Sequence, residues 1–313
     1  MAKVGLIRQF LYILVLALFS CVFLVSYHLT TTLTNPILFD LLDHQPTPYM
    51  VVVLSAAGNR QRREKLRAYG WLSHAWISHS TGARIPYRYV FVCGRDAQHD
   101  LAEEVEQHGD LVVWPGPETY PNIVNKVAWI LAKLQRDGHN FNFLVKTDDD
   151  SFVNISNLER VLAGVSPSEL WYGGECIHNK TVYRHGKFAV SRFDYPAPRY
   201  PSYAAGAGYV VSAALTWRLT AEMWRVQQFP VEDAYVGVVS SLVGGSVRCV
   251  PGFYHQHWRG YPGRVGDAVV LHYVQIEEIQ LLGEMVWRQD TGDSVWDDKS
   301  VSFITGAPSE QQI

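Results

Sequence analysis

Short apolar runs alternate with helix-like segments along most of the chain. The runs are typical of buried strands, because they are short and end at turn-forming or polar positions. They occupy Tyr49–Leu54, Tyr87–Cys93, Asp110–Trp114 and Phe141–Lys146. Between the last two, Asn122–Arg136 carries apolar residues at the 3.6-residue spacing of an amphipathic helix. The alternation predicts an α/β fold with a mostly parallel sheet and helices on both faces.

Three carboxylates, Asp148, Asp149 and Asp150, follow the last of these runs. Ligands of such sheets bind beyond the carboxyl ends of the strands. Neighbouring carboxylates repel unless a cation lies between them, and hard divalent ions take oxygen ligands. Asp148 and Asp150 project to the same side of an extended chain, so this pair is the candidate metal site. The alternative is a solvated acidic turn that caps the helix near Asn157–Leu162.

The N-terminal segment follows a different pattern. No Asp, Glu, Lys or Arg occurs from Gln9 to Asn35, and Phe10–Val25 is mostly apolar. A helix of about 20 apolar residues spans a bilayer. Basic residues precede this run, and none follows it until Arg60, which predicts a cytoplasmic N-terminus. We therefore expect a type II anchor. A cleaved signal peptide is the alternative, but its apolar region would be only about 7–15 residues long.

These patterns divide the chain into successive segments. We expect a cytoplasmic tail at 1–8, a transmembrane signal-anchor at 9–28, a stem at 29–48, a lumenal domain at 49–289 and a polar tail at 290–313. Two sequons, at Asn154 and Asn179, are candidate N-glycosylation sites in a lumenal domain.

Composition indicates a folded protein of near-neutral charge. Hydrophobic residues make up 48% of the chain and include 10 Trp, 17 Tyr and 13 Phe, which disordered chains lack. The 27 Lys+Arg against 30 Asp+Glu give a net charge of −3. Such a chain lacks the net positive electrostatic potential that attracts the phosphate backbone of a nucleic acid, so no nucleic-acid partner is expected.

Cysteine usage fits an oxidising compartment. Of the four cysteines, Cys21 falls in the predicted anchor, which leaves an odd number for the lumenal domain. Cys93 ends an apolar run, as inert buried thiols do. Cys176 with Cys249 is the one disulfide that we expect.

The sequence Lys146–Asn154 (KTDDDSFVN) resembles the signature of the β-1,3-glycosyltransferases. These inverting enzymes include β-1,3-galactosyltransferases, β-1,3-N-acetylglucosaminyltransferases and the Fringe relatives. Three further blocks match the family in the same order: Arg62–Arg67, Tyr200–Val211 and Glu232–Gly237. The resemblance extends from Tyr49 to about Leu282. It implies a single Rossmann-like nucleotide-sugar domain of the GT-A type.

The resemblance also suggests how the donor is held. It implies a UDP-sugar donor bound by Arg63, Arg67, Asp148 and Asp149. The residues themselves leave two interpretations open, because Arg60, Arg63 and Arg67 fall on one helical face. Guanidinium groups suit a diphosphate, but an Arg-rich helix face is also typical of a solvated surface.

Residues for the sugars follow from the later blocks. The resemblance places Gly206, Gly208, Tyr209 and Glu232 at the sugar and acceptor site and makes Asp233 the general base. A carboxylate within about 3 Å of a sugar hydroxyl can take its proton during attack. Ordinary capping at a helix N-terminus would also explain Asp233.

Histidine completes the candidate metal site. His272 matches the place where the family carries a histidine before its last helix, and the resemblance implies that it joins Asp148 and Asp150 around Mn²⁺. An imidazole with carboxylates suits such an ion. His255 and His257 lie in an aromatic stretch and are interpreted as structural.

The resemblance implies a metal-dependent β-1,3-galactosyltransferase in the Golgi membrane, with the catalytic domain in the lumen. Its acceptor would be a glycan on a glycoprotein, proteoglycan or glycolipid. Two alternatives remain: transfer of N-acetylglucosamine, and a lectin-like or chaperone relative without turnover. Asp148, Asp150 and Asp233 together favour an enzyme, since a binding protein needs no base.

Overall fold

The computed structural model describes residues 46–257 and 265–290. The predicted anchor at 9–28 and nearly all of the predicted polar tail lie outside these residues. Among the helices that are described, none combines the length and the apolar character needed to cross a bilayer.

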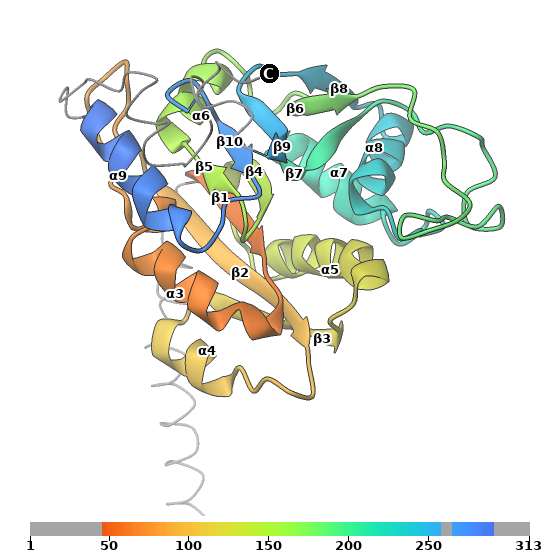
Figure 1. Cartoon of the computed structure of the whole chain (residues 1–313). Coiled ribbons are helices and arrows are strands. Elements are labelled where there is room, and N and C mark those ends of the chain that lie inside the picture. The colour runs from red at the N-terminus through yellow and green to blue at the C-terminus, as the bar shows by residue number, and fades with distance from the viewer. Residues whose placement is uncertain (1–45, 258–264, 291–313) are drawn as a thin grey trace, which may run out of the picture.

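A mixed seven-stranded sheet forms the centre of the described fold, with the order β3-β2-β1-β4-β7-β6-β8 (Figure 1). All of its strands run in one direction except β7, which is antiparallel to both β4 and β6. The strands are β1 (Thr47–Leu54), β2 (Tyr87–Arg95), β3 (Leu111–Pro117), β4 (Phe141–Asp148), β6 (Trp171–Ile177), β7 (Tyr203–Ser212) and β8 (Ser246–Cys249). The predicted α/β class and the four predicted strands are confirmed.

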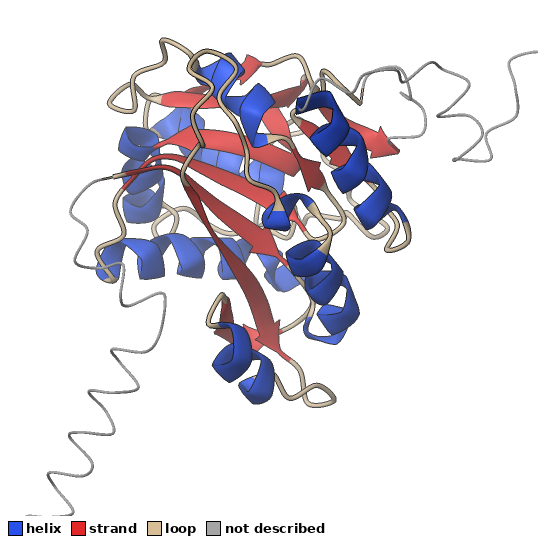
Figure 2. Cartoon of the chain, turned by 90° about the vertical axis from the view of Figure 1, so that its left-hand side faces the viewer, coloured by secondary structure: helices blue, strands red, loops and turns tan. Residues whose placement is uncertain are grey.

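Helices cover both faces of this sheet (Figure 2). They are α3 (Arg60–Ala68), α4 (Ala102–His108), α5 (Ile123–Arg136), α6 (Ile155–Leu162), α7 (Ala213–Glu222), α8 (Glu232–Leu242) and α9 (Glu278–Asp290). Short 3₁₀ turns occur at Ala57–Asn59, Trp71–Ser73 and Tyr120–Asn122. The helix predicted at Asn122–Arg136 is α5.

The alternation of side chains along β1 explains the two layers of core. Val51 and Val53 face a cluster that includes Trp71 and residues of α6 and α9. Val52, on the other face, packs in a second cluster with residues of α5, α7 and α8. Because successive side chains of a strand point to opposite faces, a uniformly apolar strand is the one that fits between two helical layers.

A small second sheet brings the C-terminal part of the described chain to the acidic triplet. Its strands are β5 (Phe152–Val153), β10 (Val270–His272) and β9 (Phe253–His257), in the order β5-β10-β9. β5 follows the triplet almost directly and pairs antiparallel with β10. The Val274 N–H also donates to the Asp150 carbonyl at 2.8 Å. His272 is therefore held beside Asp150 by backbone pairing.

Candidate active site

The carboxyl ends of β1 and β4 meet at one edge of the sheet, where Leu54 pairs with Asp148. A cleft with a cavity volume of about 620 Å³ opens there. Its walls come from β4, β7, the start of α8, the small sheet and the loop that connects β6 to β7. In open α/β sheets this edge, where the strand order reverses, is the usual place for a ligand.

Lys146 connects the acidic groups of the cleft. Its side chain is only 3% exposed, and its Nζ donates to Asp148 Oδ1 at 2.8 Å and to the Gly206 carbonyl at 2.6 Å. Glu232 Oε2 lies 3.5 Å from the same Nζ. Burial disfavours the charged amine, but the Asp148 and Glu232 carboxylates outweigh it and raise the pKa of Lys146. The amine therefore carries a fixed positive charge.

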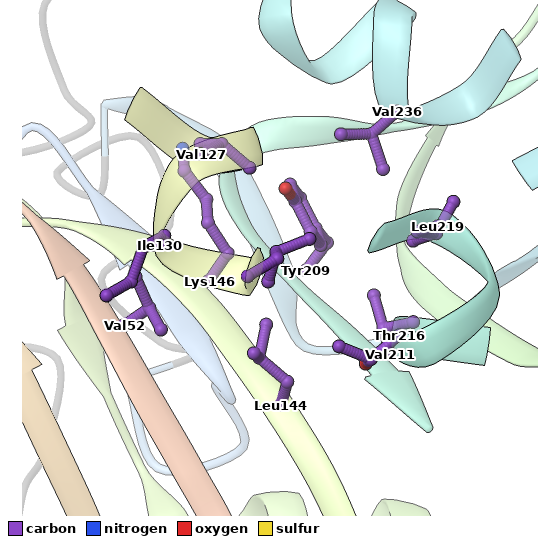
Figure 3. A pocket seen from close by; sticks show the side chains of 11 residues that line it. Val52, Val127, Ile130, Leu144, Lys146, Tyr209, Val211, Thr216, Leu219 and Val236 are labelled. Carbon is purple, nitrogen blue, oxygen red and sulfur yellow. The ribbon is translucent and has the colours of Figure 1, made fainter. Parts of the chain in front are cut away.

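The packing beneath this amine is apolar. Figure 3 shows the stem of Lys146 and the ring of Tyr209 among aliphatic side chains from the sheet and from α5, α7 and α8. The space left between them has a volume of about 10 Å³, at most that of a single water. Because no ligand fits there, a ligand can reach Lys146 only from the cleft at the strand ends.

Asp148, Asp150 and His272 form a group suited to a divalent metal. One ligand atom of each lies within 4.8 Å of the others. The His272 ring contacts the His255 carbonyl through Nδ1 at 2.8 Å, which leaves Nε2 facing Asp150 Oδ1 at 3.4 Å. Metal-binding histidines are commonly oriented by such a second hydrogen bond. Two carboxylates and one imidazole fit the ligand preference of Mn²⁺.

The electrostatics of this group also fit a cation. Burial opposes charge on both Asp150 and His272, but their mutual contact lowers the pKa of Asp150 and raises that of His272. The carboxylate environment that raises the pKa of His272 also favours a cation at this position.

Asp149 faces the opposite way from its neighbours. It is 7% exposed, and its Oδ2 accepts from Ser55 Oγ at 2.6 Å and from Asn59 Nδ2 at 2.9 Å. Burial raises the pKa of Asp149. The Ser55 hydroxyl is bonded in turn by Arg63 Nη1 at 2.8 Å. Asp149 thus anchors the triplet to the end of β1 and does not line the cleft.

Arg63 and Arg67 are not brought to the cleft, which corrects their assignment to the donor. Arg63 is 0% exposed and donates twice to Glu104 of α4, at 2.8 and 2.6 Å. Arg67 pairs with Asp110 and with Glu104. The predicted common face is real, but it packs against α4. Its acidic partners lie some 40 residues further along the chain, so the sequence pattern did not reveal them.

Asp233, at the start of α8, lies in the cleft. Its Oδ2 accepts from the Gly206 N–H at 3.0 Å, and its Oδ1 accepts from the Ala234 N–H at 2.8 Å. The N-cap of α8 is Val231, so Asp233 is not the capping residue. Burial raises the pKa of Asp233 despite these two hydrogen bonds and nearby Lys146. A raised pKa brings a carboxylate closer to the range useful for a base.

The other predicted sugar-site residues separate into two groups. Gly206 and Glu232 line the cleft with Asp233. Tyr209 is 2% exposed and donates to Glu232 Oε1 at 2.7 Å from beneath. Gly208 faces β10, where an added Cβ would lie 2.9 Å from the methyl groups of Val270. Tyr209 and Gly208 therefore support the site without lining it.

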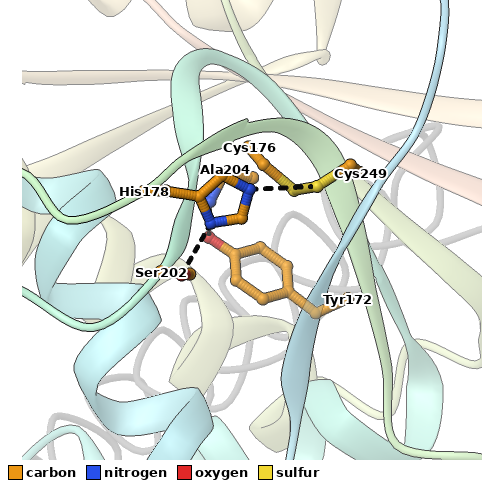
Figure 4. Close-up of a disulfide and its surroundings, with 6 residues drawn as sticks. All are labelled: Tyr172, Cys176, His178, Ser202, Ala204 and Cys249. Atoms are coloured by element: carbon orange, nitrogen blue, oxygen red, sulfur yellow. Dashed lines mark hydrogen bonds between the residues drawn. A yellow bond between two sulfur atoms is a disulfide. The ribbon is translucent and has the colours of Figure 1, made fainter.

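A second group of potential ligands, Cys176, His178 and Cys249, is not a thiolate metal site. The two sulfur atoms form a disulfide between β6 and β8, with His178 beside it (Figure 4). This is the disulfide expected from the sequence. Cys93 is free and buried, also as expected.

The two sequons differ in access. Asn179 is exposed. Asn154 is 3% exposed, and its Oδ1 accepts from the Asn157 N–H at 2.9 Å as the N-cap of α6. A glycan on Asn154 would require that cap to be broken, which corrects the prediction for this site.

Sequence reasoning gave no role to Lys146 or to the His255 carbonyl. A lysine two residues before Asp148 has its side chain on the same side of an extended strand, and that spacing was the available signal. The contact with the His255 carbonyl could not be predicted, because every residue has the same carbonyl group and only the fold decides which one meets His272. His255 itself pairs with Glu175 at 2.8 Å and also lines the cleft, so it is not purely structural.

The galactosyltransferase family model matches residues 61–248, which is more than half of the chain and includes the acidic triplet, Gly206 and Asp233. The chain belongs to the galactosyltransferase family. Within this family, it is 28% identical over 207 residues to the human acetylgalactosaminyl-O-glycosyl-glycoprotein β-1,3-N-acetylglucosaminyltransferase, covering 62% of this chain and 52% of that one. It is 26% identical over 219 residues to the rat UDP-GalNAc:β-1,3-N-acetylgalactosaminyltransferase 1, covering 66% and 64%.

This galactosyltransferase-family chain therefore spans about half the length of the first of these curated relatives. Solved structures give weaker matches. A galactosyltransferase, LgtC, solved with donor and acceptor sugar analogues, aligns with a TM-score of 0.38 and 11% identity over 77% of this chain and 99% of its own. A glycosyltransferase involved in glycosylation of the PBCV-1 major capsid aligns with a TM-score of 0.37 and 15% identity over 76% and 100%.

Proposed function

We propose that this protein is an inverting β-1,3-glycosyltransferase that moves a hexose from a UDP-sugar to the 3-hydroxyl of an acceptor glycan. The observation that carries the proposal is the pairing of two chemistries in one cleft. Asp233 supplies a half-buried carboxylate of raised pKa, and Asp148, Asp150 and His272 supply a candidate metal-binding group. A lectin-like protein needs no general base such as Asp233. A simple acidic turn does not explain why His272 lies beside Asp148 and Asp150.

The chemical step follows from these positions. The acceptor hydroxyl oxygen attacks C1 of the donor sugar, and the bond from C1 to the β-phosphate oxygen breaks with its electron pair leaving on UDP. The hydroxyl proton passes to the Asp233 carboxylate, which the Gly206 and Ala234 N–H groups hold in place. Attack opposite the leaving group inverts the configuration at C1.

Asp148, Asp150 and His272 would hold a divalent ion, Mn²⁺ by ligand type, which would neutralise charge on the diphosphate leaving group. Lys146 keeps Asp148 in position and limits the negative charge of the site. Asp149 fixes the turn between the two metal-binding carboxylates through Ser55. These contacts hold the metal-binding side chains on a rigid strand end.

The donor sugar is galactose, N-acetylglucosamine or N-acetylgalactosamine. The resemblance of the sequence blocks suggested galactose, and the family bears the galactosyltransferase name. The name of the similar human protein specifies N-acetylglucosamine, which supports that donor at least as well as galactose, and the name of the similar rat protein specifies N-acetylgalactosamine as a third candidate.

A donor screen tests the proposal. The purified lumenal domain is incubated with UDP-galactose, UDP-N-acetylglucosamine and UDP-N-acetylgalactosamine, each with a panel of acceptors, and released UDP is measured. We expect one donor to be used, loss of activity with a chelator and recovery with Mn²⁺. Undiminished transfer in chelator would contradict the metal assignment. Absence of transfer with every donor, together with intact glycan binding, would favour the lectin-like alternative.

We further propose that the protein is a single-pass type II protein of the Golgi membrane with its catalytic domain in the lumen. The charge-free N-terminal segment supports an anchor, and its flanking charges support this orientation. The disulfide between Cys176 and Cys249 suits an oxidising compartment.

A further inference from the structure

The loop between β6 and β7, residues 178–202, differs in charge from the rest of the chain. It carries five Lys or Arg residues and a single acid, Asp194, in a chain whose net charge is −3. We call it the basic loop; it is the long green segment at the right of Figure 1. A concentration of one sign beside a cleft raises the local concentration of ligands of the opposite sign.

The basic loop is held in one conformation although it has no helix or long strand. The Arg184 guanidinium donates to the carbonyls of Val190, Ser191, Tyr195, Pro196 and Ala197. Tyr200 stacks on Phe229 with 5.5 Å between ring centroids. The Arg184 guanidinium is therefore occupied by carbonyls of the loop itself. The Tyr200–Phe229 contact fixes the loop against the segment that leads into α8.

One side of the basic loop forms a wall of the active-site cleft. Lys180, Tyr183 and Phe188 line the cleft, and Tyr120 lies against Phe188 at 5.7 Å. The Lys187 amine lies 5.1 Å from the ring of Tyr120 and 5.3 Å from that of Phe188. The Lys180 amine lies 5.3 Å from the ring of Tyr183. The wall therefore consists of Lys180 and aromatic rings, and the Lys187 amine lies over two of these rings without lining the cleft itself.

These two lysines lack acidic partners. Within the described ranges, no carboxylate pairs with the amine of Lys180 or Lys187, whereas Lys126, Lys133 and Lys146 each have one at 2.6–2.8 Å. Tyr183 and Phe188 are also 48% and 45% exposed. Both the positive charge and the flat apolar surfaces are available to a ligand.

The wall lies on the acceptor side of the cleft. Tyr200 of the basic loop stacks on Phe229, in the segment that leads to Asp233, and Asp233 accepts from the Gly206 N–H of β7, the strand that the loop enters. The basic loop is therefore fixed next to the segment that carries the proposed base. The base must contact the acceptor hydroxyl, so groups on its side contact the acceptor rather than the donor diphosphate.

We propose that the acceptor is an anionic glycan, with a sulfate ester or a carboxylate on or next to the sugar that is extended. This inference rests on the proposed transferase function. The lysine amines pair with the anionic group, and the apolar faces of the sugar rings pack on Tyr183 and Phe188. A lysine is a point charge on a flexible stem and accommodates either kind of anion.

Matched acceptors test the proposal. Three disaccharides with the same linkage are compared: one neutral, one with a sulfate ester, and one with a uronic acid carboxylate. We expect kcat/KM to be about tenfold higher for at least one charged acceptor, the size of one charge-assisted hydrogen bond. The double variant Lys180→Gln/Lys187→Gln should remove this preference without raising KM for the donor. Arg192→Gln is the control, because Arg192 is exposed on the same loop but neither lines the cleft nor, among the described residues, lies over one of its aromatic rings as Lys180 and Lys187 do.

The possible outcomes separate the two proposals. Equal kcat/KM for all three acceptors, or a preference that survives in the double variant, would overturn the inference. A rise in donor KM that is the same for every acceptor would assign the lysines to the UDP-sugar instead and overturn it too. If no transfer occurs at all, the transferase proposal fails. Calorimetric binding of the sulfated and carboxylated disaccharides then decides the inference, which predicts binding that the double variant loses.

Discussion

Neighbouring carboxylates in this protein have different environments and therefore different roles. Asp148 lines the cleft and Asp150 faces His272, whereas Asp149 points to Ser55 and Asn59. Glu232 is tied to Tyr209 and lies close to Lys146, whereas the Asp233 side chain receives only backbone N–H groups. A carboxylate held by backbone donors inside a cleft keeps its side chain available for a substrate proton.

Asp233→Asn should lower kcat by about 10²–10⁴-fold, the usual contribution of a positioned general base. UDP-sugar binding, measured by calorimetry, should be retained. Thermal stability should change little, because the variant removes a partly desolvated charge but also loses one acceptor for a backbone N–H. Asp267→Asn, at an exposed position with 83% side-chain accessibility, is the control and should leave kcat unchanged. A fully active Asp233→Asn variant would remove Asp233 as the base.

The pH dependence of wild-type activity is a second, independent test of Asp233 as the base. A base works only when ionised, and burial raises the pKa of Asp233 above the ordinary value of about 4. Activity should therefore fall as the pH drops through this raised pKa. The sign for stability is opposite, since a raised native pKa means that the ionised form costs stability at neutral pH. The residual activity of Asp233→Asn should lack this acidic limb.

Arg63→Met should destabilise the fold rather than weaken donor binding. The substitution leaves Glu104, which is 1% exposed, without its main partner, and removing one member of a buried pair costs about 3–5 kcal/mol. Urea unfolding measures this loss directly. Arg60→Ala, at an exposed pair on the same helix, should shift the midpoint little. A stable Arg63→Met protein with a raised donor KM would restore the donor-binding interpretation.

At the scale of elements, the small sheet is what joins the C-terminal histidine to the triplet. β5 and β10 pair over two residues each, and His272 follows directly in β10. The sequence separation between Asp150 and His272 is thereby closed by backbone hydrogen bonds. The metal-binding group is thus a product of sheet pairing and not of a local motif.

His272→Ala should weaken Mn²⁺ binding at least about tenfold, because it removes a ligand that is already oriented. Calorimetry with Mn²⁺ in the presence of UDP measures the affinity. His257→Ala is the matched control, since His257 lies in the same sheet, is exposed and is not part of the group. Equal affinities for the two variants would show that Asp148 and Asp150 act without the histidine.

Periodicity was sufficient to predict the elements but not their partners. The strands β1 to β4 and helix α5 were predicted because local apolar spacing reports which face is buried. The structure does not support the donor role that the resemblance implied for Arg63, and periodicity could not decide it, since a helical face rich in arginine looks alike whether it meets a diphosphate or a buried Glu104. Nor did the resemblance separate the residues of β7 that line the cleft from those that support it. Gly208 faces β10 of the small sheet, and Tyr209 is buried beneath Glu232.

At the scale of the whole molecule, the N-terminal charge pattern predicts a lumenal catalytic domain. In intact microsomes the C-terminal domain should resist added protease and become sensitive after detergent. Asn179, which is exposed, should carry glycan. The glycosidase-sensitive shift should disappear in Asn179→Gln and persist in Asn154→Gln, where the side chain caps α6. Digestion without detergent would contradict the proposed orientation.

The central claim is an inverting transfer in which Asp233 is the base. Its most direct test is NMR observation of the product during turnover of an α-linked UDP-sugar with the preferred acceptor. We predict that the first product formed is β-linked to the 3-position of the acceptor, with UDP released in equal amount. An α-linked product would require retention of configuration, which a single direct displacement with one base cannot give, and would contradict the mechanism.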